Sequence, residues 1–288
     1  MVKHLLSVGD FSRKEIEDLI TVSVDVKAHP EKYLDSLKNR TLIMLFQKPS
    51  TRTRISFEAG MTRLGGHAIY FDPSGSQLSR GESIGDTAKT LSGYAHAVMA
   101  RVFAHETVSE LAKNSSIPVV NGLSDLEHPC QILADLFTMK ECGKLDGKIV
   151  YVGDGNNVCN SLIVAAKILE LNFTVSCPEG FDPSIKGANI IRDPVEAVSD
   201  ADVVYTDVWI SMGDEKEKEV REKAFRPYQV NSELVSHAKK DFVFMHCLPA
   251  HRGFEVTDEV IDSENSVVFQ QAENRMHMQN AILLKLME

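Results

Sequence analysis

Residues 41–54 read Thr41-Leu-Ile-Met-Leu-Phe46-Gln-Lys-Pro49-Ser50-Thr51-Arg52-Thr53-Arg54. The first six are large or branched apolar residues, which predicts a buried strand that ends near Gln47. After Arg54, apolar residues recur at helical spacing until Gly65 and Gly66 stop the pattern. The stretch therefore predicts a strand that turns directly into a helix at residues 50–54.

The turn at residues 50–54 has the composition of an anion site. The first turn of a helix carries unpaired N–H groups and the positive end of the helix dipole. Hydroxyl groups and two guanidinium groups are added there, which suits a phosphate-sized dianion. The alternative is an ordinary Ser/Thr cap followed by two solvated arginines, and it accounts for only one hydroxyl.

Strand and helix patterns alternate along the whole chain. Predicted strands lie at 41–46, 67–71, 97–103 and 117–121, and again at 148–152, 173–177, 203–207, 242–246 and 266–269. This alternation predicts an α/β fold with two domains, each a parallel β-sheet flanked by helices. The Gly-punctuated stretch at residues 143–147 marks the boundary, so that one domain covers residues 1–143 and the next covers 144–270. Ligands of such folds bind at the carboxyl ends of the strands.

The composition narrows the class of protein. The 288 residues are 43% hydrophobic and carry a net charge of −10, so the chain repels nucleic acid and anionic membranes. No apolar run approaches the ~20 residues that span a bilayer, and the first residues lack the apolar core of a signal peptide. Five scattered cysteines predict a reduced, cytoplasmic protein without a structural metal: Cys130, Cys142, Cys159, Cys177 and Cys247.

Two further polar features lie in the first half of the chain. Arg101 stands near the end of the third predicted strand, where apolar residues are expected. It is either an edge-strand arginine or, as we prefer, a ligand contact at the strand end. His128 lies just before a helix that Pro129 opens, and Gln131 follows one turn later. The pair either caps a helix or faces whatever its N-terminus binds.

Two polar features of the second half also follow predicted strands. Gly153-Asp-Gly-Asn-Asn-Val158 resembles the opening of a dinucleotide fingerprint, but Val158 stands where the third glycine belongs. A tight turn that presents the amides of Asn156 and Asn157 at a helix start is the plainer interpretation. Asp207 ends the strand 203–207, where it could receive an ammonium group or cap the next turn.

The stretch His246-Cys247-Leu248-Pro249-Ala250-His251 raises the hypothesis of a metal site or a Cys/His nucleophile. Pro249 prevents a helical pairing of Cys247 with His251, and no carboxylate stands beside them in the sequence to orient the histidine. We therefore expect a thiol that lines a polar pocket, with neither a metal nor a covalent intermediate.

Together these motifs resemble the aspartate/ornithine carbamoyltransferase family, and most closely its ornithine-specific branch. The resemblance covers the whole chain in collinear order. Its signatures are Ser50-Thr-Arg-Thr-Arg54, Arg101, His128-Pro-Cys-Gln131, Asp207-Val-Trp-Ile-Ser-Met-Gly213, His246-Cys-Leu-Pro249 and Glu273-Asn-Arg275. The stretches Ser211-Met-Gly213 and His246-Cys-Leu-Pro249 favour ornithine as the acceptor.

The resemblance implies that carbamoyl phosphate and L-ornithine react to give citrulline and phosphate, with no cofactor and no metal. It implies catalytic roles for Arg52, Arg101, His128, Cys247 and Arg275. It implies carbamoyl phosphate contacts from Ser50, Thr51, Arg52, Thr53, Gln77, Arg101, His128, Pro129, Cys130, Gln131, Cys247, Leu248 and Arg275. It implies ornithine contacts from Asn157, Asp207, Ser211 and Met212.

The resemblance also implies how the chain is organised and assembled. Residues 1–143 would bind carbamoyl phosphate, residues 144–270 would bind ornithine, and a C-terminal helix at 271–288 would pack back on the first domain. The polar loop at residues 72–82 has little apolar surface of its own and needs a partner or stays mobile. In the family this loop reaches a neighbouring subunit, so we expect a homotrimer whose active sites are shared through Gln77.

Three alternatives compete with this interpretation. A carbamoyltransferase could act on another amine such as putrescine, although the set of Asp207, Ser211 and Met212 favours an amino acid. A nicotinamide dehydrogenase would leave the arginine turn unexplained and lacks the third glycine. An anion-binding regulator with this fold would not need Arg52 and Arg275 together with the other catalytic-type residues.

Overall fold

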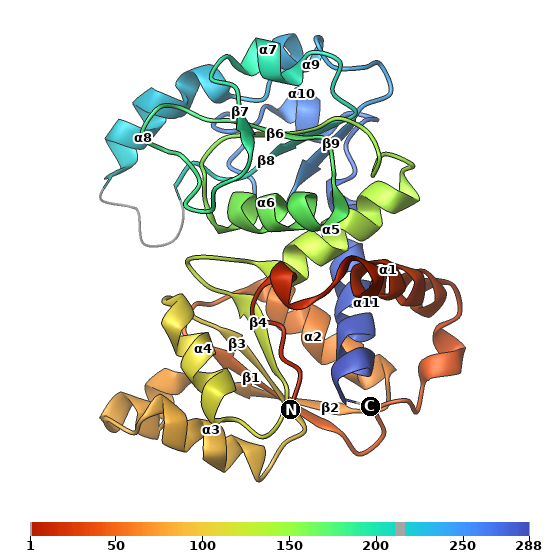
Figure 1. The fold of residues 1–288 in the computed structure, drawn as a ribbon, viewed down its shortest axis with the longest axis vertical. Coiled ribbons are helices and arrows are strands. Elements are labelled where there is room, and N and C mark those ends of the chain that lie inside the picture. The colour runs from red at the N-terminus through yellow and green to blue at the C-terminus, as the bar shows by residue number, and fades with distance from the viewer. Residues whose placement is uncertain (1, 211–216, 288) are drawn as a thin grey trace. The chain divides into compact units, whose positions relative to one another are not determined.

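The computed structural model describes residues 2–210 and 217–287. The chain divides into two compact units, coloured by residue number in Figure 1. Unit 1 comprises Met1–Phe137 and Asn274–Glu288, and unit 2 comprises Thr138–Glu273. Each unit contains one parallel β-sheet flanked by helices, which confirms the predicted fold class. Within the described residues, no helix combines the length and the apolar character that crossing a membrane requires.

Unit 1 is built on a four-stranded sheet with the order β2-β1-β3-β4. Its strands are β1 (Thr41–Phe46), β2 (His67–Phe71), β3 (Ala97–Arg101) and β4 (Val119–Leu123). Strand β2 pairs with one side of β1, and β3 pairs with the other side. The boundary between β1 and β3 is therefore the topological switch point of this sheet. The carboxyl ends of these two strands are therefore the expected place for a ligand.

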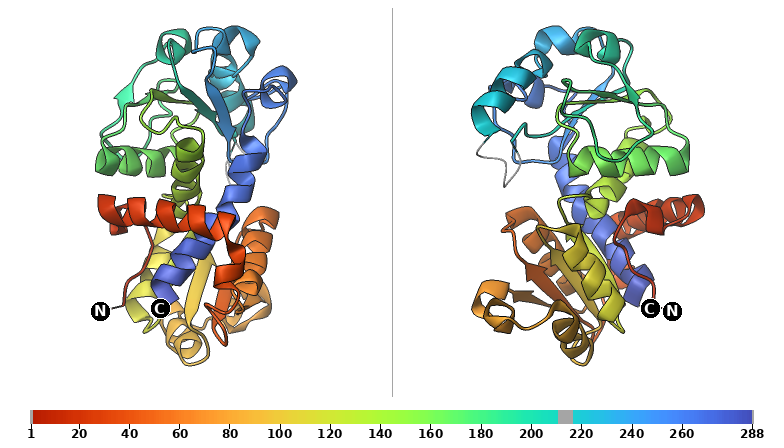
Figure 2. Two further views of the ribbon diagram at one scale, coloured as in Figure 1. Left: turned by 90° about the vertical axis from the view of Figure 1, so that its right-hand side faces the viewer. Right: turned by 60° about the vertical axis from the view of Figure 1, so that its left-hand side comes forward.

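Helices cover both faces of the unit 1 sheet, as Figures 1 and 2 show. The helices α3 (Ile84–Ser92) and α4 (His105–Asn114) pack on one face, through a core that includes Leu91, Val108 and Leu111. The other face is covered by α1 (Arg13–Ala28), α2 (Thr51–Arg63) and the last helix, α11 (Val268–Met287). Lys27 Nζ donates a hydrogen bond to Asn274 Oδ1 at 2.8 Å, so the C-terminal helix does pack back on the first domain, as predicted.

Unit 2 contains a five-stranded sheet with the order β7-β6-β5-β8-β9. Its strands are β5 (Ile149–Val152), β6 (Phe173–Ser176), β7 (Asn189–Ile190), β8 (Val203–Thr206) and β9 (Val243–His246). Its helices are α5 (Pro129–Glu141, shared with unit 1), α6 (Asn157–Leu169), α7 (Pro194–Val198), α8 (Lys218–Phe225), α9 (Ser232–Val235) and α10 (Asp258–Ile261). Here the direction of sheet building reverses between β5 and β8, which are direct neighbours.

Two local expectations from the sequence differ from the structure. The predicted strand at 266–269 is wrong, because only Ser266 bridges to Phe244 and helix α11 already begins at Val268. The loop at residues 72–82 is not irregular throughout, since it contains the 3-10 turns η3 (Pro73–Gly75) and η4 (Gln77–Arg80). Leu78 packs against the core of unit 1, so the loop has an apolar anchor on its own domain. Among the residues that the structure describes, the other 3-10 turns are η1 (Val8–Asp10), η2 (Pro30–Tyr33) and η6 (Arg226–Tyr228).

Candidate active site

The last residues of strands β1 and β3 lie side by side at the carboxyl edge of the unit 1 sheet. Phe46 is paired with Arg101 in the sheet, and the Gln47 N–H donates to the Arg101 carbonyl at 2.8 Å. The Gln47 side chain then accepts a hydrogen bond from the Phe103 N–H at 3.1 Å. This crossing contact holds the end of β3 against the turn that follows β1. Arg101 therefore lies at the switch point of the unit 1 sheet, and it is buried.

The predicted arginine turn opens helix α2 as expected. Ser50 caps the helix, and its hydroxyl accepts a hydrogen bond from the Thr53 N–H at 3.3 Å. Arg52 is half-buried in the first turn. Arg54 is engaged elsewhere, because its Nε contacts Glu58 at 3.4 Å and its guanidinium lies 4.1 Å from the centre of the Tyr70 ring. The structure thus separates the two arginines, and Arg52 is the one available at the helix N-terminus.

Arg275 joins three helices of unit 1 in one buried hydrogen-bonded network. Its guanidinium donates to Thr53 Oγ1 of α2 at 3.3 Å and to Gln131 Oε1 of α5 at 2.5 Å. The Gln131 amide in turn donates to Asp135 Oδ1 at 2.9 Å. All four side chains are buried. The structure therefore brings together three residues that the sequence could only place on separate helices, Thr53, Gln131 and Arg275.

His128 is a buried, neutral imidazole beside two arginines. Burial lowers its pKa well below the usual value, and the positive charges of Arg275 and Arg101 lower it further. A neutral imidazole can still donate one N–H to an oxygen without adding a positive charge. Its position is set by the preceding turn, in which the Ser124 N–H donates to the Glu127 carbonyl at 2.9 Å. His128 thus fits a hydrogen-bond donor better than a proton source.

The residues that follow His128 have structural partners of their own. Pro129 is the first residue of α5, where its missing N–H costs nothing. The Cys130 thiol donates to the Asn121 carbonyl at 3.4 Å, and burial raises its pKa to about 12. The Cys130 side chain therefore stays a protonated thiol that ties helix α5 to strand β4.

The neutral His128 should make the protein less stable in acid. In the unfolded chain its pKa returns to about 6.5. Below that pH the unfolded state binds a proton that the folded state excludes, so the free energy of unfolding falls as pH falls. The contribution reaches at most about 1.4 kcal/mol per pH unit. Urea unfolding of the unmodified protein and of His128→Gln between about pH 5 and 7.5 should show a shallower slope for the variant. Parallel curves would contradict the lowered pKa.

The switch point of unit 2 carries a second polar group. Asn156 follows β5 and caps helix α6, accepting hydrogen bonds from the N–H groups of Val158 at 3.0 Å and Cys159 at 3.2 Å. Its Nδ2 donates to Asp207 Oδ2 at 2.7 Å. Asn157 is the first residue of α6 and is half-buried. The predicted residues Asn157 and Asp207 therefore follow neighbouring strands, with Asn156 holding the aspartate.

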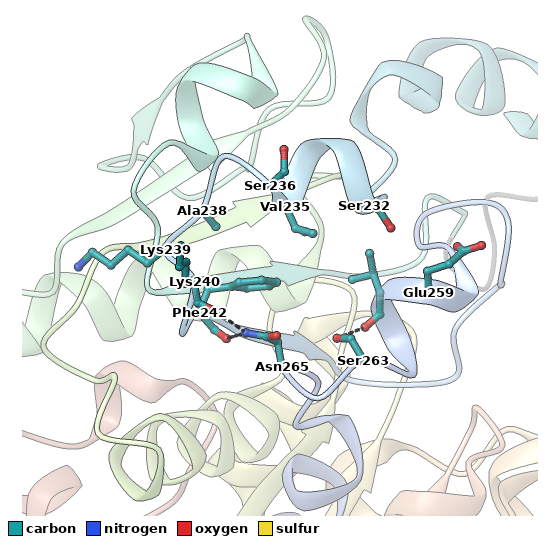
Figure 3. Close-up of a pocket in the computed structure, with 11 residues that line it drawn as sticks. Ser232, Val235, Ser236, Ala238, Lys239, Lys240, Phe242, Glu259, Ser263 and Asn265 are labelled. Carbon is teal, nitrogen blue, oxygen red and sulfur yellow. Dashed lines mark hydrogen bonds between the residues drawn. The ribbon is translucent and has the colours of Figure 1, made fainter.

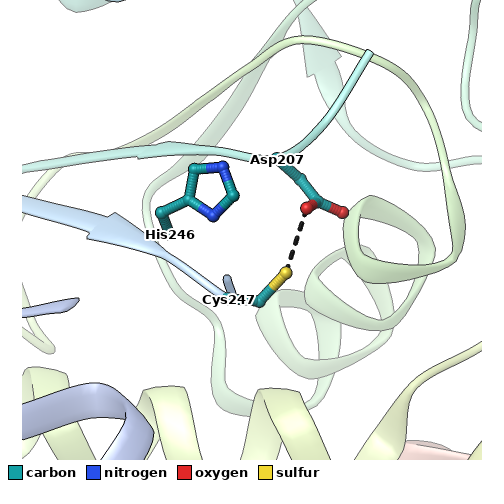
Figure 4. A group of neighbouring side chains, drawn as sticks. All are labelled: Asp207, His246 and Cys247. Carbon is teal, nitrogen blue, oxygen red and sulfur yellow. Dashed lines mark hydrogen bonds between the residues drawn. The ribbon is translucent and has the colours of Figure 1, made fainter. Parts of the chain in front are cut away.

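Cys247 has a carboxylate partner that the sequence did not reveal. Its Sγ donates to Asp207 Oδ1 at 3.0 Å, as Figure 4 shows. No carboxylate is adjacent to this cysteine in the sequence, because Asp207 and Cys247 are forty positions apart and meet only through the pairing of β8 with β9. Asp207 thus accepts hydrogen bonds from both Cys247 and Asn156. This hydrogen bond places the Cys247 thiol among polar groups, which is compatible with the expected role as a contact residue.

Asp207, His246 and Cys247 have the types of a metal-binding group, and their ligand atoms lie within 4.8 Å of one another (Figure 4). Both ring nitrogens of His246 are already used, however. Nδ1 accepts the Leu248 N–H at 2.9 Å, and Nε2 lies 3.1 Å from Glu255 Oε1. A metal bound through His246 would have to break one of these contacts. The prediction that no metal is needed stays a prediction.

The other predicted site residues are placed as follows. Leu248 follows Cys247 with a backbone φ of +57° and precedes a cis peptide bond to Pro249. Gln77 is exposed at the start of η4. Thr51 is exposed in the first turn of α2. Ser211 and Met212 lie outside the described residues.

A surface pocket of about 320 Å³ lies elsewhere in unit 2 (Figure 3). It is lined by residues that include Phe242, Glu259 and Asn265. Phe242 precedes strand β9, whereas His246 ends it. The pocket therefore opens at the amino edge of the sheet, away from Asp207 and Cys247.

Sequence reasoning missed two residues that support the unit 2 group. Glu255 binds His246, as described above. Arg221 of α8 donates to Asp154 Oδ2 at 2.8 Å and to the Trp209 carbonyl at 3.2 Å. It thereby ties the turn after β5 to the segment after β8. Neither residue stands in a motif, so nothing in the sequence marks the partner it selects.

The chain matches two family profiles over nearly its whole length. Residues 3–141 match "Aspartate/ornithine carbamoyltransferase, carbamoyl-P binding domain". Residues 146–286 match "Aspartate/ornithine carbamoyltransferase, Asp/Orn binding domain". Each profile therefore falls on one half of the chain and on one of its two sheets.

Individual proteins are similar to the chain from end to end. The ornithine carbamoyltransferase of Archaeoglobus fulgidus is 53% identical, over 99% of this chain and 98% of its own. The catabolic ornithine carbamoyltransferase of Thermoplasma volcanium is 49% identical, over 99% and 98%. The solved structure of ornithine carbamoyltransferase from Pyrococcus furiosus is 52% identical, with a TM-score of 0.93 over 98% of this chain and 96% of its own.

Proposed function

The chain belongs to the aspartate/ornithine carbamoyltransferase family, and from this membership we propose that it acts on carbamoyl phosphate and L-ornithine. It transfers the carbamoyl group to the δ-amine of ornithine, giving L-citrulline and phosphate. The observation that carries this function is the buried network of Arg275, Thr53 and Gln131 at the N-terminus of α2. This network holds the guanidinium of Arg275 beside the start of α2, where its N–H groups could donate to the phosphate dianion and to the carbonyl oxygen of the substrate.

We assign carbamoyl phosphate to residues 1–143 with the helix 271–288, and ornithine to residues 144–270. Ser50, Thr51, Arg52 and Thr53 would hold the phosphate, since a helix N-terminus and a guanidinium favour a dianion. The developing oxyanion on the carbamoyl carbon would receive hydrogen bonds from Arg101, His128 and Arg275. Because His128 is neutral, it stabilises that oxygen as a dipole.

The remaining carbamoyl contacts orient the group for attack. Gln131 and the Leu248 carbonyl would bind the carbamoyl NH2, and Cys247 would contact the reacting amine. Pro129 and Cys130 would contribute by placing the start of α5. Holding the carbon and the nitrogen in reacting geometry is the main catalytic task, because phosphate is already a good leaving group.

The ornithine half of the reaction depends on a neutral amine. A free δ-amine has a pKa near ~10, so binding must select or create its unprotonated form. Its nitrogen then forms a bond to the carbamoyl carbon, the C–O bond breaks with its electron pair going to the phosphate, and the nitrogen loses a proton, for which the departing phosphate is the acceptor that the reaction supplies. Asp207, which already accepts the Cys247 thiol, would lie near the amines. Asn157, Ser211 and Met212 would hold the α-amino and carboxylate groups.

Citrulline formation tests the proposed function directly. Purified protein is given carbamoyl phosphate and ornithine in the presence of a chelator and without nicotinamide. Product should form at rates typical of an enzyme, roughly 1–1000 per second. Putrescine in place of ornithine is the matched substrate, because it has the same amines but no carboxylate. Turnover of putrescine alone would overturn the assignment of ornithine.

We also propose that the enzyme works in the cytoplasm as a homotrimer with shared active sites. The face around β2 supports an assembly, because apolar side chains are exposed there. Ile55 is 57% exposed, Ile69 is 45% exposed and Tyr70 is 37% exposed on this edge strand and on α2. Leu78 anchors the nearby loop while Gln77 remains exposed to serve a neighbour.

Mixed trimers test whether Gln77 acts on a neighbouring subunit. Arg52→Ala and Gln77→Ala proteins, each poorly active, are unfolded together and refolded. In a closed ring of three subunits, each mixed trimer then contains one site with both residues intact. Separated mixed trimers should therefore show about one third of the unmodified activity. Activity no higher than the mean of the two parents would show that Gln77 does not act across the interface.

We place the reaction in arginine metabolism, in either the biosynthetic or the degradative direction. Relatives of both kinds match the chain, named anabolic in Pyrococcus furiosus and catabolic in Thermoplasma volcanium. Measuring citrulline synthesis and citrulline phosphorolysis side by side, at matched pH and substrate concentrations, decides between the two directions.

A further inference from the structure

His246 and Glu255 form a buried pair directly behind Cys247. Neither side chain is more than 1% exposed, and His246 Nε2 lies 3.1 Å from Glu255 Oε1. The same carboxylate oxygen accepts the His251 N–H at 2.5 Å. A buried carboxylate is costly unless hydrogen bonds satisfy it, so these two contacts are needed for it to lie here.

The protonation of His246 follows from its backbone neighbour. The Leu248 N–H can only donate, and it points at His246 Nδ1 at 2.9 Å. Nδ1 must therefore carry a lone pair, which leaves the ring proton on Nε2. That proton is donated to Glu255. The carboxylate thus selects the one neutral tautomer that can also hold the Leu248 backbone.

The hydrogen bond from the Leu248 N–H to His246 stabilises an unusual backbone conformation. The Leu248 φ of +57° lies in the left-handed region, which residues with a Cβ rarely adopt. The hydrogen bond to His246 satisfies its N–H in that conformation. Beyond the turn, Arg252 donates to Asp258 at 2.6 Å and to Asp262 at 2.5 Å, which ties the loop to α10. His246 and Leu248, which flank Cys247, are therefore held by contacts that lead back to Glu255, and Arg252 holds the end of the loop separately.

We propose that Glu255 is a positioning residue of the reaction. Acting through His246, it sets the direction of the Leu248 carbonyl and of the Cys247 side chain, the two groups to which the proposed function gives contacts with the carbamoyl group and the amine. The inference rests on the proposed function for the meaning of those two groups. The chain of contacts from Glu255 to His246 to Leu248 stands independently of it.

Four variants separate positioning from simple folding. Glu255→Ala removes the acceptor. Glu255→Gln keeps an amide oxygen that can accept from both His246 and His251, and so should rescue function. His246→Asn keeps an acceptor near the Nδ1 position but loses Glu255. Glu259→Gln makes the same chemical change on an exposed glutamate nearby and is the matched control.

Three measurements are made on each variant, of which thermal unfolding gives the melting temperature. Citrulline formation gives kcat and both KM values, and hydrogen exchange gives the protection of the Leu248 amide. Glu255→Ala should lower kcat by roughly 100-fold, since a small misplacement of reacting groups has that effect. Its Leu248 amide should exchange about 10-fold faster or more. Glu255→Gln and Glu259→Gln should remain close to the unmodified protein. His246→Asn keeps an acceptor that Glu255 no longer orients, so it should lose less kcat and less Leu248 protection than Glu255→Ala.

Several results would overturn the proposal. One is an unchanged kcat and unchanged Leu248 protection in Glu255→Ala. Another is an equal loss in Glu255→Gln and Glu255→Ala, because the charge and not the geometry would then matter. A lowered melting temperature with normal kcat per folded molecule would assign Glu255 to stability alone. If the unmodified protein made no citrulline, the proposed function would fail, while the exchange data would still decide whether Glu255 controls Leu248.

Discussion

Arg52→Ala should lower the turnover of citrulline formation by roughly 100-fold, a loss of ~3 kcal/mol in transition-state stabilisation. Arg52 is the arginine that stays available at the N-terminus of α2, since Arg54 is engaged by Glu58 and Tyr70. The phosphate gains negative charge as the C–O bond breaks, so a donor placed there acts most strongly in the transition state. The expected change is therefore in kcat and not only in KM.

Steady-state kinetics with both substrates varied measure this effect. Arg63→Ala is the matched control, because it removes the same charge from the exposed far end of the same helix. It should stay within about threefold of the unmodified enzyme, since the potential of an exposed charge is screened over ~10 Å. Near-normal turnover of Arg52→Ala with only a raised KM for carbamoyl phosphate would make Arg52 a ground-state clamp.

Arg275→Ala should have an effect at least as large, on the order of 100- to 1000-fold in kcat/KM. The variant loses a donor to the carbamoyl oxygen and also leaves Thr53 and Gln131 without the group that joins them. Arg275→Lys is the instructive comparison. A lysine keeps the charge but lacks the planar fork that serves two acceptors at once, so it should recover little activity.

A second property of Arg275→Ala can be followed without substrate. The positive charge of Arg275 is one of the causes that lower the pKa of His128. Its removal should raise that pKa, which NMR titration of the imidazole measures. Low activity together with an unchanged His128 pKa would mean that Arg275 acts only on the substrate and does not tune the histidine.

Much of the architecture could be predicted because it depends on local patterns. The sequence predicts the strand-to-helix turn at residues 50–54 because an apolar run comes before it, Gln47-Lys-Pro49 breaks that run, and apolar residues recur at helical spacing after it. The failed strand at 266–269 shows the limit of such patterns. A short apolar run reads equally well as a strand or as the first turn of a helix, and here the tertiary structure chooses the helix α11.

Site residues that stand in a short motif could be predicted from the sequence. Their hydrogen-bond partners could not be predicted where those partners come from a distant part of the chain. His246 and Cys247 could be singled out from the sequence, but their partners could not. Asp207 reaches Cys247 only because β8 pairs with β9, and Glu255 reaches His246 only because the following loop folds back. Such choices are made by topology, which a single sequence does not display.

The placement of polar groups at the switch point of the unit 2 sheet has a practical consequence for redesign. The strands β5 and β8 pack the core with Val150, Val152 and Val204, whereas Asn157 and Asp207 follow the strands at their carboxyl ends. Different residues of the same strands and turns therefore determine the stability of unit 2 and its choice of carbamoyl acceptor. A mutant library confined to Asn157, Asp207, Ser211 and Met212 should explore new amines as carbamoyl acceptors, because it leaves the helix cap Asn156 and the buried core residue Trp209 unchanged.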